Sequence, residues 1–265
     1  MRKTGLAAIA AIGIATATPA VAQDSTDQAA NAPFTSFSLM TGVDYSSGDY
    51  GTGLDTNILV VPATARLTTG NLRFGATLPW LRIDGANVIG GADGGPIVID
   101  PNAPRTIRKG IGDLSLSATY AIPEESIGVG LEFTGRVKMP TGSQSKGLST
   151  GKTDLSASVD LSKTFGIITP FIDVGHKWAG DPSYIDLNNT WFGSVGASVA
   201  LGNSVLLASY DYREATSPLS EDSQEVFGAF GAPVSKHFNL TVYGSAGLSE
   251  GAPDYGAGGM VTLKM

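Results

Sequence analysis

The stretch IGVGLEFTGRVKM, residues 127–139, decides the fold class of this chain. Its odd-numbered positions are apolar or glycine, and its even-numbered positions hold glycine, glutamate, threonine, arginine and lysine. This alternation with a period of two is typical of a β-strand with one apolar and one polar face. Because similar segments recur along the chain, we interpret the apolar face as facing lipid and the polar face as lining a wet lumen.

Twelve segments in all have this alternating pattern. They are residues 36–45, 55–67, 72–81, 113–122, 127–139, 154–165, 168–178, 190–201, 204–213, 224–234, 240–248 and 255–265. The connections between them are alternately long and short, and the longest, residues 84–110, is expected to be irregular. A soluble sandwich has no reason to segregate its loops by length, whereas an outer-membrane barrel has long outer loops and short periplasmic turns.

The predicted fold is therefore all-β: a single closed 12-stranded antiparallel up-and-down transmembrane β-barrel. Strands of about 10 residues match the length that a tilted strand needs to cross the bilayer. With an even number of strands, the first strand begins and the last strand finishes on the same, periplasmic side. Since backbone groups cannot pair with water inside the hydrocarbon, the last strand must pair with the first.

The N-terminus has the features of a secretory signal. Arg2 and Lys3 precede an apolar segment, and Ala20-Val21-Ala22 forms an A-x-A cleavage site. We expect a signal peptide at residues 1–22, a flexible periplasmic leader at 23–35 and the barrel at 36–265. The alternative, a membrane anchor, requires an apolar run long enough to span about 30 Å of hydrocarbon, and this run is too short.

The composition is that of an exported, cysteine-free and glycine-rich chain. Hydrophobic residues make up 42%, charged residues 15%, and there are 35 glycines and no cysteine. The absence of cysteine excludes disulfides and thiolate metal sites. The formal net charge of −7 argues against nucleic acid as a partner.

Charged residues of both signs fall on the predicted lumen face. They are Arg66, Arg73, Glu132, Arg136, Lys138, Asp154, Asp160, Asp173, Lys177, Asp211 and Arg213. Twelve strands give a barrel wider than a packed eight-stranded one and narrower than a sixteen-stranded porin. Opposite charges across such a lumen would either form ladders that narrow the pore or line a small polar passage.

Aromatic residues gather near the ends of the predicted strands. They are Tyr45, Trp80, Tyr120, Trp178, Trp191, Tyr210, Tyr212 and Tyr255. This distribution indicates girdles at the two membrane interfaces. The alternative is that each one is an ordinary packing residue.

Few residues suggest catalysis or metal binding. His237 falls in a short turn, and His176 falls on the apolar face beside Trp178. An outer-membrane phospholipase would need a serine next to such a histidine, and no serine stands out on the neighbouring outward positions. Asp181 and Asp186, in a loop, are only a weak signal for a divalent cation. We therefore expect no enzyme activity, no metal and no cofactor.

Short blocks of sequence resemble a known family. They are LPW at 78–80, RKGIGDLSLSATY at 108–120, GRVKMPTG at 135–142, TGKTDLSASVDLSK at 150–163, DVGHKWAGD at 173–181 and YDYREA at 210–215. In this order they resemble the outer-membrane family named for the MetA pathway of phenol degradation. The resemblance implies an outer-membrane β-barrel with a role in the uptake of hydrophobic or aromatic compounds, and it carries no substrate-binding residues.

The sequence thus predicts a bacterial outer-membrane channel or uptake protein that works by passive diffusion, with residues 84–110 as a gating or selecting segment. Its expected partners are the lipid bilayer, the barrel-insertion machinery and a small-molecule solute. The alternatives are a structural or adhesion barrel with a sealed lumen and, less favoured, an outer-membrane phospholipase.

Overall fold

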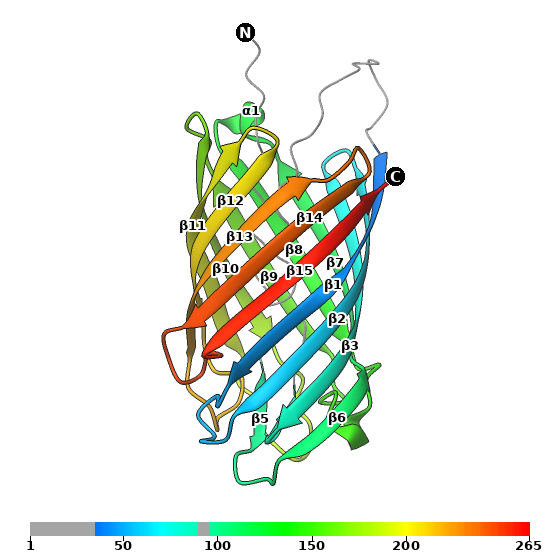
Figure 1. The fold of residues 1–265 in the computed structure, drawn as a ribbon, viewed down its shortest axis with the longest axis vertical. Coiled ribbons are helices and arrows are strands. Elements are labelled where there is room, and N and C mark those ends of the chain that lie inside the picture. The colour runs from blue at the N-terminus through cyan, green and yellow to red at the C-terminus, as the bar shows by residue number, and fades with distance from the viewer. Residues whose placement is uncertain (1–34, 90–95) are drawn as a thin grey trace.

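One continuous antiparallel sheet closes on itself in the computed structural model, which describes residues 35–89 and 96–265 (Figure 1). Closure is made by β1 (Thr35–Gly48) and β15 (Tyr255–Lys264), which pair from Ser38 opposite Lys264 to Ser47 opposite Tyr255. The remaining barrel strands are β2 (Thr56–Thr69), β3 (Leu72–Gly85), β6 (Thr106–Ile111), β7 (Leu114–Ile122), β8 (Gly130–Met139), β9 (Asp154–Ser162), β10 (Ile168–Trp178), β11 (Thr190–Leu201), β12 (Ser204–Arg213), β13 (Ser223–Pro233) and β14 (Phe238–Gly247).

The barrel has twelve strands because β6 and β7 together occupy one position. β6 pairs with the outer half of β3 and β7 with its inner half. Between them the Gly112 backbone N–H donates to the carbonyl of Pro79 at 2.9 Å, which keeps the interrupted strand attached. The predicted strand 113–122 is therefore only the inner part of this position.

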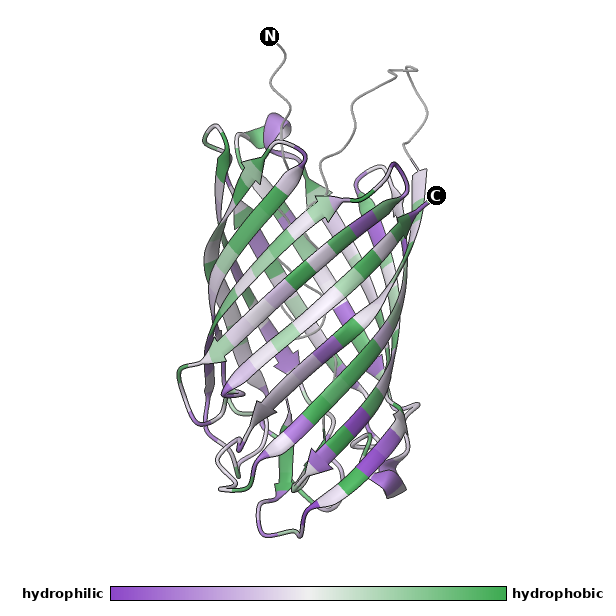
Figure 2. Cartoon of the chain, viewed as in Figure 1, coloured by the Kyte–Doolittle hydropathy of each residue, from purple (hydrophilic) through white to green (hydrophobic). Residues whose placement is uncertain are grey.

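The lengths of the connections differ at the two ends of the barrel, as predicted. Short connections and the end of β15 lie at one end, here called the inner end, and the long loops lie at the other, the outer end (Figure 1). Bands of hydrophobic and hydrophilic residues alternate along the strands (Figure 2). On β10, for example, Ile172 and Val174 are 46% and 49% exposed, whereas Asp173 between them is 2% exposed. The outer surface of the barrel is therefore apolar, as a lipid-facing surface must be.

Two local predictions were wrong. Residues 127–139 do not form one strand, because the short helix α1 (Glu124–Ile127) precedes β8, which begins at Gly130. Two glutamates occupy the helix's first turn, where negative charge is favourable, and Gly128 ends it with a φ of 83°. The segment 84–110 is also not irregular: besides β6 it contains the hairpin strands β4 (Asn87–Ile89) and β5 (Ile97–Asp100).

The predicted signal peptide and nearly all of the predicted leader lie outside the described residues, and β1 begins at Thr35 rather than at residue 36. A single turn of 3₁₀ helix, η1 (Gln144–Lys146), lies in the loop between β8 and β9. Among the described residues, no helix is long and apolar enough to cross a membrane.

Candidate functional site: the barrel interior and its outer mouth

The predicted lumen residues occupy strand positions that alternate with exposed apolar side chains. Six of them are at least nine-tenths buried, namely Glu132, Asp154, Asp160, Asp173, Lys177 and Asp211. Arg66, Arg73, Arg136, Lys138 and Arg213 are partly buried. Since charged residues are almost never fully buried unless they are paired or hydrogen-bonded, the interior must supply partners for them.

Near the inner end, the partner of Arg73 on β3 is Glu132 on β8. A guanidinium Nη2 lies 2.5 Å from the carboxylate Oε2 of Glu132, and the two side chains are 17% and 11% exposed. Strand β7 lies between their strands, so this ion pair crosses one strand of the wall. Sequence analysis placed both residues inside but did not predict their pairing.

A second charged cluster lies at the outer ends of β7 to β10. The Lys138 ammonium is 3.1 Å from carboxylate oxygens of both Asp113 and Asp154, and the Lys177 ammonium is 3.6 Å from the Asp154 Oδ2. All four side chains are at most 13% exposed. We call these residues the lysine–aspartate cluster.

The lysine–aspartate cluster fastens the loop between β8 and β9. Asp113 accepts hydrogen bonds from the Gly142 backbone N–H and the Ser149 hydroxyl, each at 2.9 Å. Lys138 also donates to the Thr150 hydroxyl at 3.4 Å. Each member of the cluster comes from a different one of the sequence blocks quoted above, so blocks far apart in the sequence meet here. Sequence analysis missed Asp113, which opens its predicted strand.

The opposite wall holds inward-facing residues that sequence analysis did not select. Asp44 on β1 is 5% exposed and accepts a hydrogen bond from the Tyr243 hydroxyl at 2.8 Å. The Tyr243 ring lies 5.7 Å from that of Phe227 and covers Gly258, where a Cβ would lie 2.3 Å from the ring carbon Cζ. On β13, Phe227 faces inward, whereas Phe230 is 40% exposed on the outside.

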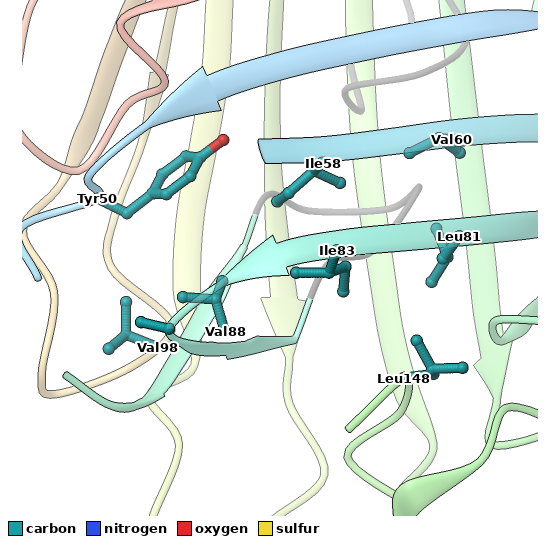
Figure 3. Packing of buried hydrophobic residues seen from close by; sticks show 9 residues of the cluster. Tyr50, Ile58, Val60, Leu81, Ile83, Val88, Val98 and Leu148 are labelled. Atoms are coloured by element: carbon teal, nitrogen blue, oxygen red, sulfur yellow. The ribbon is translucent and has the colours of Figure 1, made fainter. Parts of the chain in front are cut away.

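The outer mouth is bridged by the β4–β5 hairpin. Val88 and Val98 are 0% exposed and pack against Ile58, Val60, Leu81 and Ile83 on the inner faces of β2 and β3 (Figure 3). On its other side, the hairpin places Ile89 and Ile97 against Leu187, in the loop between β10 and β11. These two loops are four strand positions apart in the twelve-stranded barrel, a third of the way round it. The hairpin thus connects the inner faces of β2 and β3 with the loop between β10 and β11 through two buried apolar clusters.

Polar contacts hold the same hairpin. The Ser217 hydroxyl donates to the Val98 carbonyl, and Arg108 Nη2 donates to the Ala86 carbonyl. The Tyr50 side chain, 1% exposed, packs in the same cluster and lies 3.2 Å from the Ser46 hydroxyl (Figure 3). Burial raises the pKa of the Tyr50 phenol above its ordinary value. The hairpin was missed because Val88, Ile89 and residues 97–99 are too short an apolar signal for a strand.

The aromatic residues singled out in the sequence lie mostly at the outer end. Tyr45, Trp178, Trp191, Tyr210, Tyr212 and Tyr255 are within a few residues of the outer ends of their strands, Tyr120 is near the inner end of β7, and Trp80 lies farther from its strand end. Trp178, Trp191 and Tyr255 are about half exposed. Several have polar partners, such as Tyr212, whose hydroxyl donates to Asp222 at 2.7 Å.

His176 lies in an aromatic environment on the outer surface. Its ring is 4.9 Å from that of Trp178 and 4.6 Å from that of Trp191. Within residues 35–89 and 96–265, its Nδ1 has no hydrogen-bond partner. In a serine–histidine–acid triad this nitrogen would donate to the acid that orients the ring. His237 lies in the turn before β14, 3.3 Å from the Lys264 carbonyl. In the same part of the chain, no group of three acidic or histidine side chains is placed to hold a metal.

The closed barrel with an apolar exterior is of the outer-membrane type, and the protein is placed in the bacterial outer membrane. The translocator domain of the autotransporter NalP from Neisseria meningitidis superposes with a TM-score of 0.51 at 14% identity, covering 86% of this chain and 88% of that one. The β-domain of the Bordetella autotransporter BrkA has a TM-score of 0.50 at 13% identity, covering 88% and 99%.

The toluene transporter TodX of P. putida is a more distant neighbour, with a TM-score of 0.43 at 11% identity over 89% of this chain and 90% of that one. No protein of curated function has a significantly similar sequence. One family model, described as "Putative MetA-pathway of phenol degradation", matches residues 27–265. This match spans every strand of the barrel, and the chain belongs to that family.

Proposed function

We propose that this protein is an outer-membrane channel or uptake protein through which small molecules, including hydrophobic or aromatic ones, pass by passive diffusion. The observation that carries the proposal is the order of environments along the barrel. Buried apolar clusters hold the β4–β5 hairpin at the outer mouth, and the interior beyond it has buried charged and hydroxyl side chains. The description of the family, which refers to phenol degradation, supports an aromatic solute.

In this proposal the mouth and the charged interior have different roles. The β4–β5 hairpin, held by the buried apolar cluster around Val88 and Val98, lies at the entrance that a solute must pass, and its displacement exposes apolar side chains to that solute. The segment 84–110 then selects or gates, together with Glu132, Arg136, Lys138, Asp173 and Lys177 inside. The aromatic residues at the strand ends anchor the barrel in the lipid bilayer. The barrel-insertion machinery is its partner in assembly, and nucleic acid is not a partner.

The alternative, a structural or adhesion barrel with a sealed lumen, is favoured by one observation. The lysine–aspartate cluster is almost fully buried and internally paired, as expected of a packed interior. The two functions differ in one measurable property, which is whether solute crosses the barrel. The phospholipase alternative would require a serine hydroxyl beside His176, where the structure has Trp178 and Trp191.

The test is solute flux through the purified full-length chain. Liposomes containing the refolded protein should swell in isosmotic solutions of aromatic acids and of small sugars, and planar bilayers should show discrete conductance steps. A folded barrel, recognised by its resistance to unfolding in unheated detergent, that gives neither swelling nor conductance would refute the channel and leave the sealed barrel.

A further inference from the structure

The strand register of β8 to β13 places six polar side chains next to one another. Glu132 pairs with Asp160, Asp160 with Asp173, Asp173 with Ser194, Ser194 with Asp211, and Asp211 with Glu225. Side chains of directly opposed residues in an antiparallel pair share a face, with Cβ atoms about 4.5–5.5 Å apart. We call these six residues the acidic row: Glu132, Asp160, Asp173, Ser194, Asp211 and Glu225.

The acidic row climbs the inner wall from one end of the barrel to the other. Glu132 is the third residue of β8, which starts at the inner end, and Glu225 is the third residue of β13, which starts at the outer end. Because the strands are tilted, a row that follows their register rises along the barrel axis. Five steps of about 4.8 Å between strands make it about 24 Å long.

Every member of the row is buried, and its middle members have unpartnered polar atoms. The six exposed fractions lie between 2% and 9%. Among the residues that the structure describes, Asp160 Oδ1, Asp173 Oδ2, Ser194 Oγ and Asp211 Oδ1 have no hydrogen-bond partner in the protein. These four side chains are consecutive in the row. A buried carboxylate oxygen that the protein does not satisfy is met by water, by a cation or by a proton.

Basic side chains inside the barrel follow a different register. Lys264 pairs with Ser38, Ser38 with Arg66, and the same line continues through Gly75, Ser117, Arg136 and Ser156 to Lys177. On β8 and β10 this basic row stands four residues from the acidic row, as Arg136 does from Glu132. Arg73 pairs with Glu132 at the inner end of the acidic row, and Arg213 is two residues from Asp211 on β12. Basic side chains therefore lie beside the middle of the acidic row as well as at its inner end, with Arg136 acting on Asp173 and Arg213 on Asp211.

We propose that Asp160, Asp173, Ser194 and Asp211 form a path for monovalent cations, so that the barrel conducts alkali ions and protonated primary amines in preference to anions. The inference rests on the proposed channel function. Carboxylates lining a pore select cations, and several weak sites in a line allow an ion both to enter and to leave. Carboxylates spaced along a line give an ion one or two protein ligands at a time. A dedicated Ca²⁺ site gives six to eight oxygen ligands, so the row suits a monovalent cation better.

The test is the reversal potential of the purified full-length protein in planar bilayers under a KCl gradient. K⁺ should be several-fold more permeant than Cl⁻, and methylammonium should carry current in place of K⁺. The double variant Asp160→Asn, Asp173→Asn should bring the permeability ratio towards one. Ser194→Ala, which removes one hydroxyl without changing the charge, should lower the ratio by a smaller amount.

The matched control is Glu125→Gln, Glu250→Gln, which removes the same charge from exposed positions outside the strands and should leave the ratio unchanged. Resistance to unfolding should be maintained in the Asp160→Asn, Asp173→Asn variant, because asparagine has nearly the size of aspartate and the change removes the repulsion between two neighbouring buried carboxylates. An open channel with no preference for K⁺, or one in which these variants and the control behave alike, would overturn the cation path and spare the channel. A folded barrel with no conductance at all would overturn both.

Discussion

Replacing Val88 and Val98 by alanine should loosen the β4–β5 hairpin without unfolding the barrel. Both side chains are 0% exposed and pack against the inner faces of β2 and β3. The hairpin forms its own two-stranded sheet, separate from the barrel sheet. Its attachment therefore depends on side-chain packing and a few polar contacts, and those are what the two substitutions weaken.

The expected magnitude follows from the buried carbon atoms that are lost. Each valine-to-alanine change removes the equivalent of two buried CH₂ groups, about 1.6 kcal/mol, so the pair removes about 3 kcal/mol. Since about 1.4 kcal/mol corresponds to a tenfold change in an equilibrium constant, the population of detached hairpin should rise by about 100-fold. Contacts retained by the alanines and relaxation of neighbouring side chains make this figure an upper estimate.

Hydrogen exchange measures this change whether or not the barrel conducts. Backbone amides of residues 88–89 and 97–100 should exchange up to about 100-fold faster in the double variant, while amides in the middle of β10 to β15 should not change, because local opening is independent of global unfolding. In planar bilayers the same variant should spend longer in its most conducting state.

Ile107→Ala is the control, since Ile107 lies on the neighbouring strand β6 and is 60% exposed. It should leave hairpin exchange at the native rate. Unchanged exchange at the hairpin in the folded double variant would refute the reasoning, because the valines would then not hold the hairpin in place.

Three further predictions concern stability. Lys138→Met should destabilise the barrel by about 3 kcal/mol in denaturant unfolding, because it leaves Asp113 without its cation in a buried cluster. The control Lys236→Met, in an exposed turn, should change stability by less than about 0.5 kcal/mol. Equal effects of the two substitutions would contradict a structural role for the cluster. Gly196→Ala should lower the free energy of unfolding by about 1–3 kcal/mol, because its Cβ would lie 2.4 Å from the Ala208 carbonyl oxygen. Gly228→Ala, whose Cβ would lie 3.8 Å from its nearest neighbour, should be nearly neutral. The reverse order in thermal unfolding would refute the packing argument. Because burial raises the pKa of Tyr50, the neutral phenol stabilises the fold below the unfolded-state pKa of about 10, and this contribution is lost at higher pH. The opening equilibrium of the hairpin, taken as the exchange rate divided by the intrinsic rate at each pH, should therefore rise above that pH in the native protein and not in Tyr50→Phe.

The barrel could be predicted because each of its causes is local in the sequence. Alternation such as that of Ile172, Asp173 and Val174 fixes which face of a strand meets lipid, and turn residues such as Gly202-Asn203 fix where a strand reverses. Both signals can be read from a single sequence without knowing which strands pair with each other. The prediction failed at Ile127 because glycine and proline nearby favour a helical turn, an effect that a count of alternating residues does not include.

The interior could be predicted only in part, for a different physical reason. Period-two alternation says that Asp160, Asp173 and Asp211 share the inner face, but it does not say which of them are neighbours. Neighbours depend on register, and register is set by the lengths of turns and by the tilt of the closed barrel. The acidic row, the basic row and the Arg73–Glu132 pair all depend on register, so none of them can be recognised before the strands are aligned.

The outer mouth shows how the hairpin and the barrel require each other. Ile58, Val60, Leu81 and Ile83 make β2 and β3 apolar on the inner face as well as the outer one at this end, and lipid cannot cover an inner face. The hairpin covers it, so complete removal of residues 86–100 would expose this surface to water and cost stability. The two clusters that hold the hairpin differ in size. Nine buried residues form the cluster on the β2–β3 side, whereas three, of which Leu187 is one, form the other. Opening of the mouth should therefore begin at Leu187, and Leu187→Ala should raise conductance more than Ile83→Ala while destabilising the barrel less.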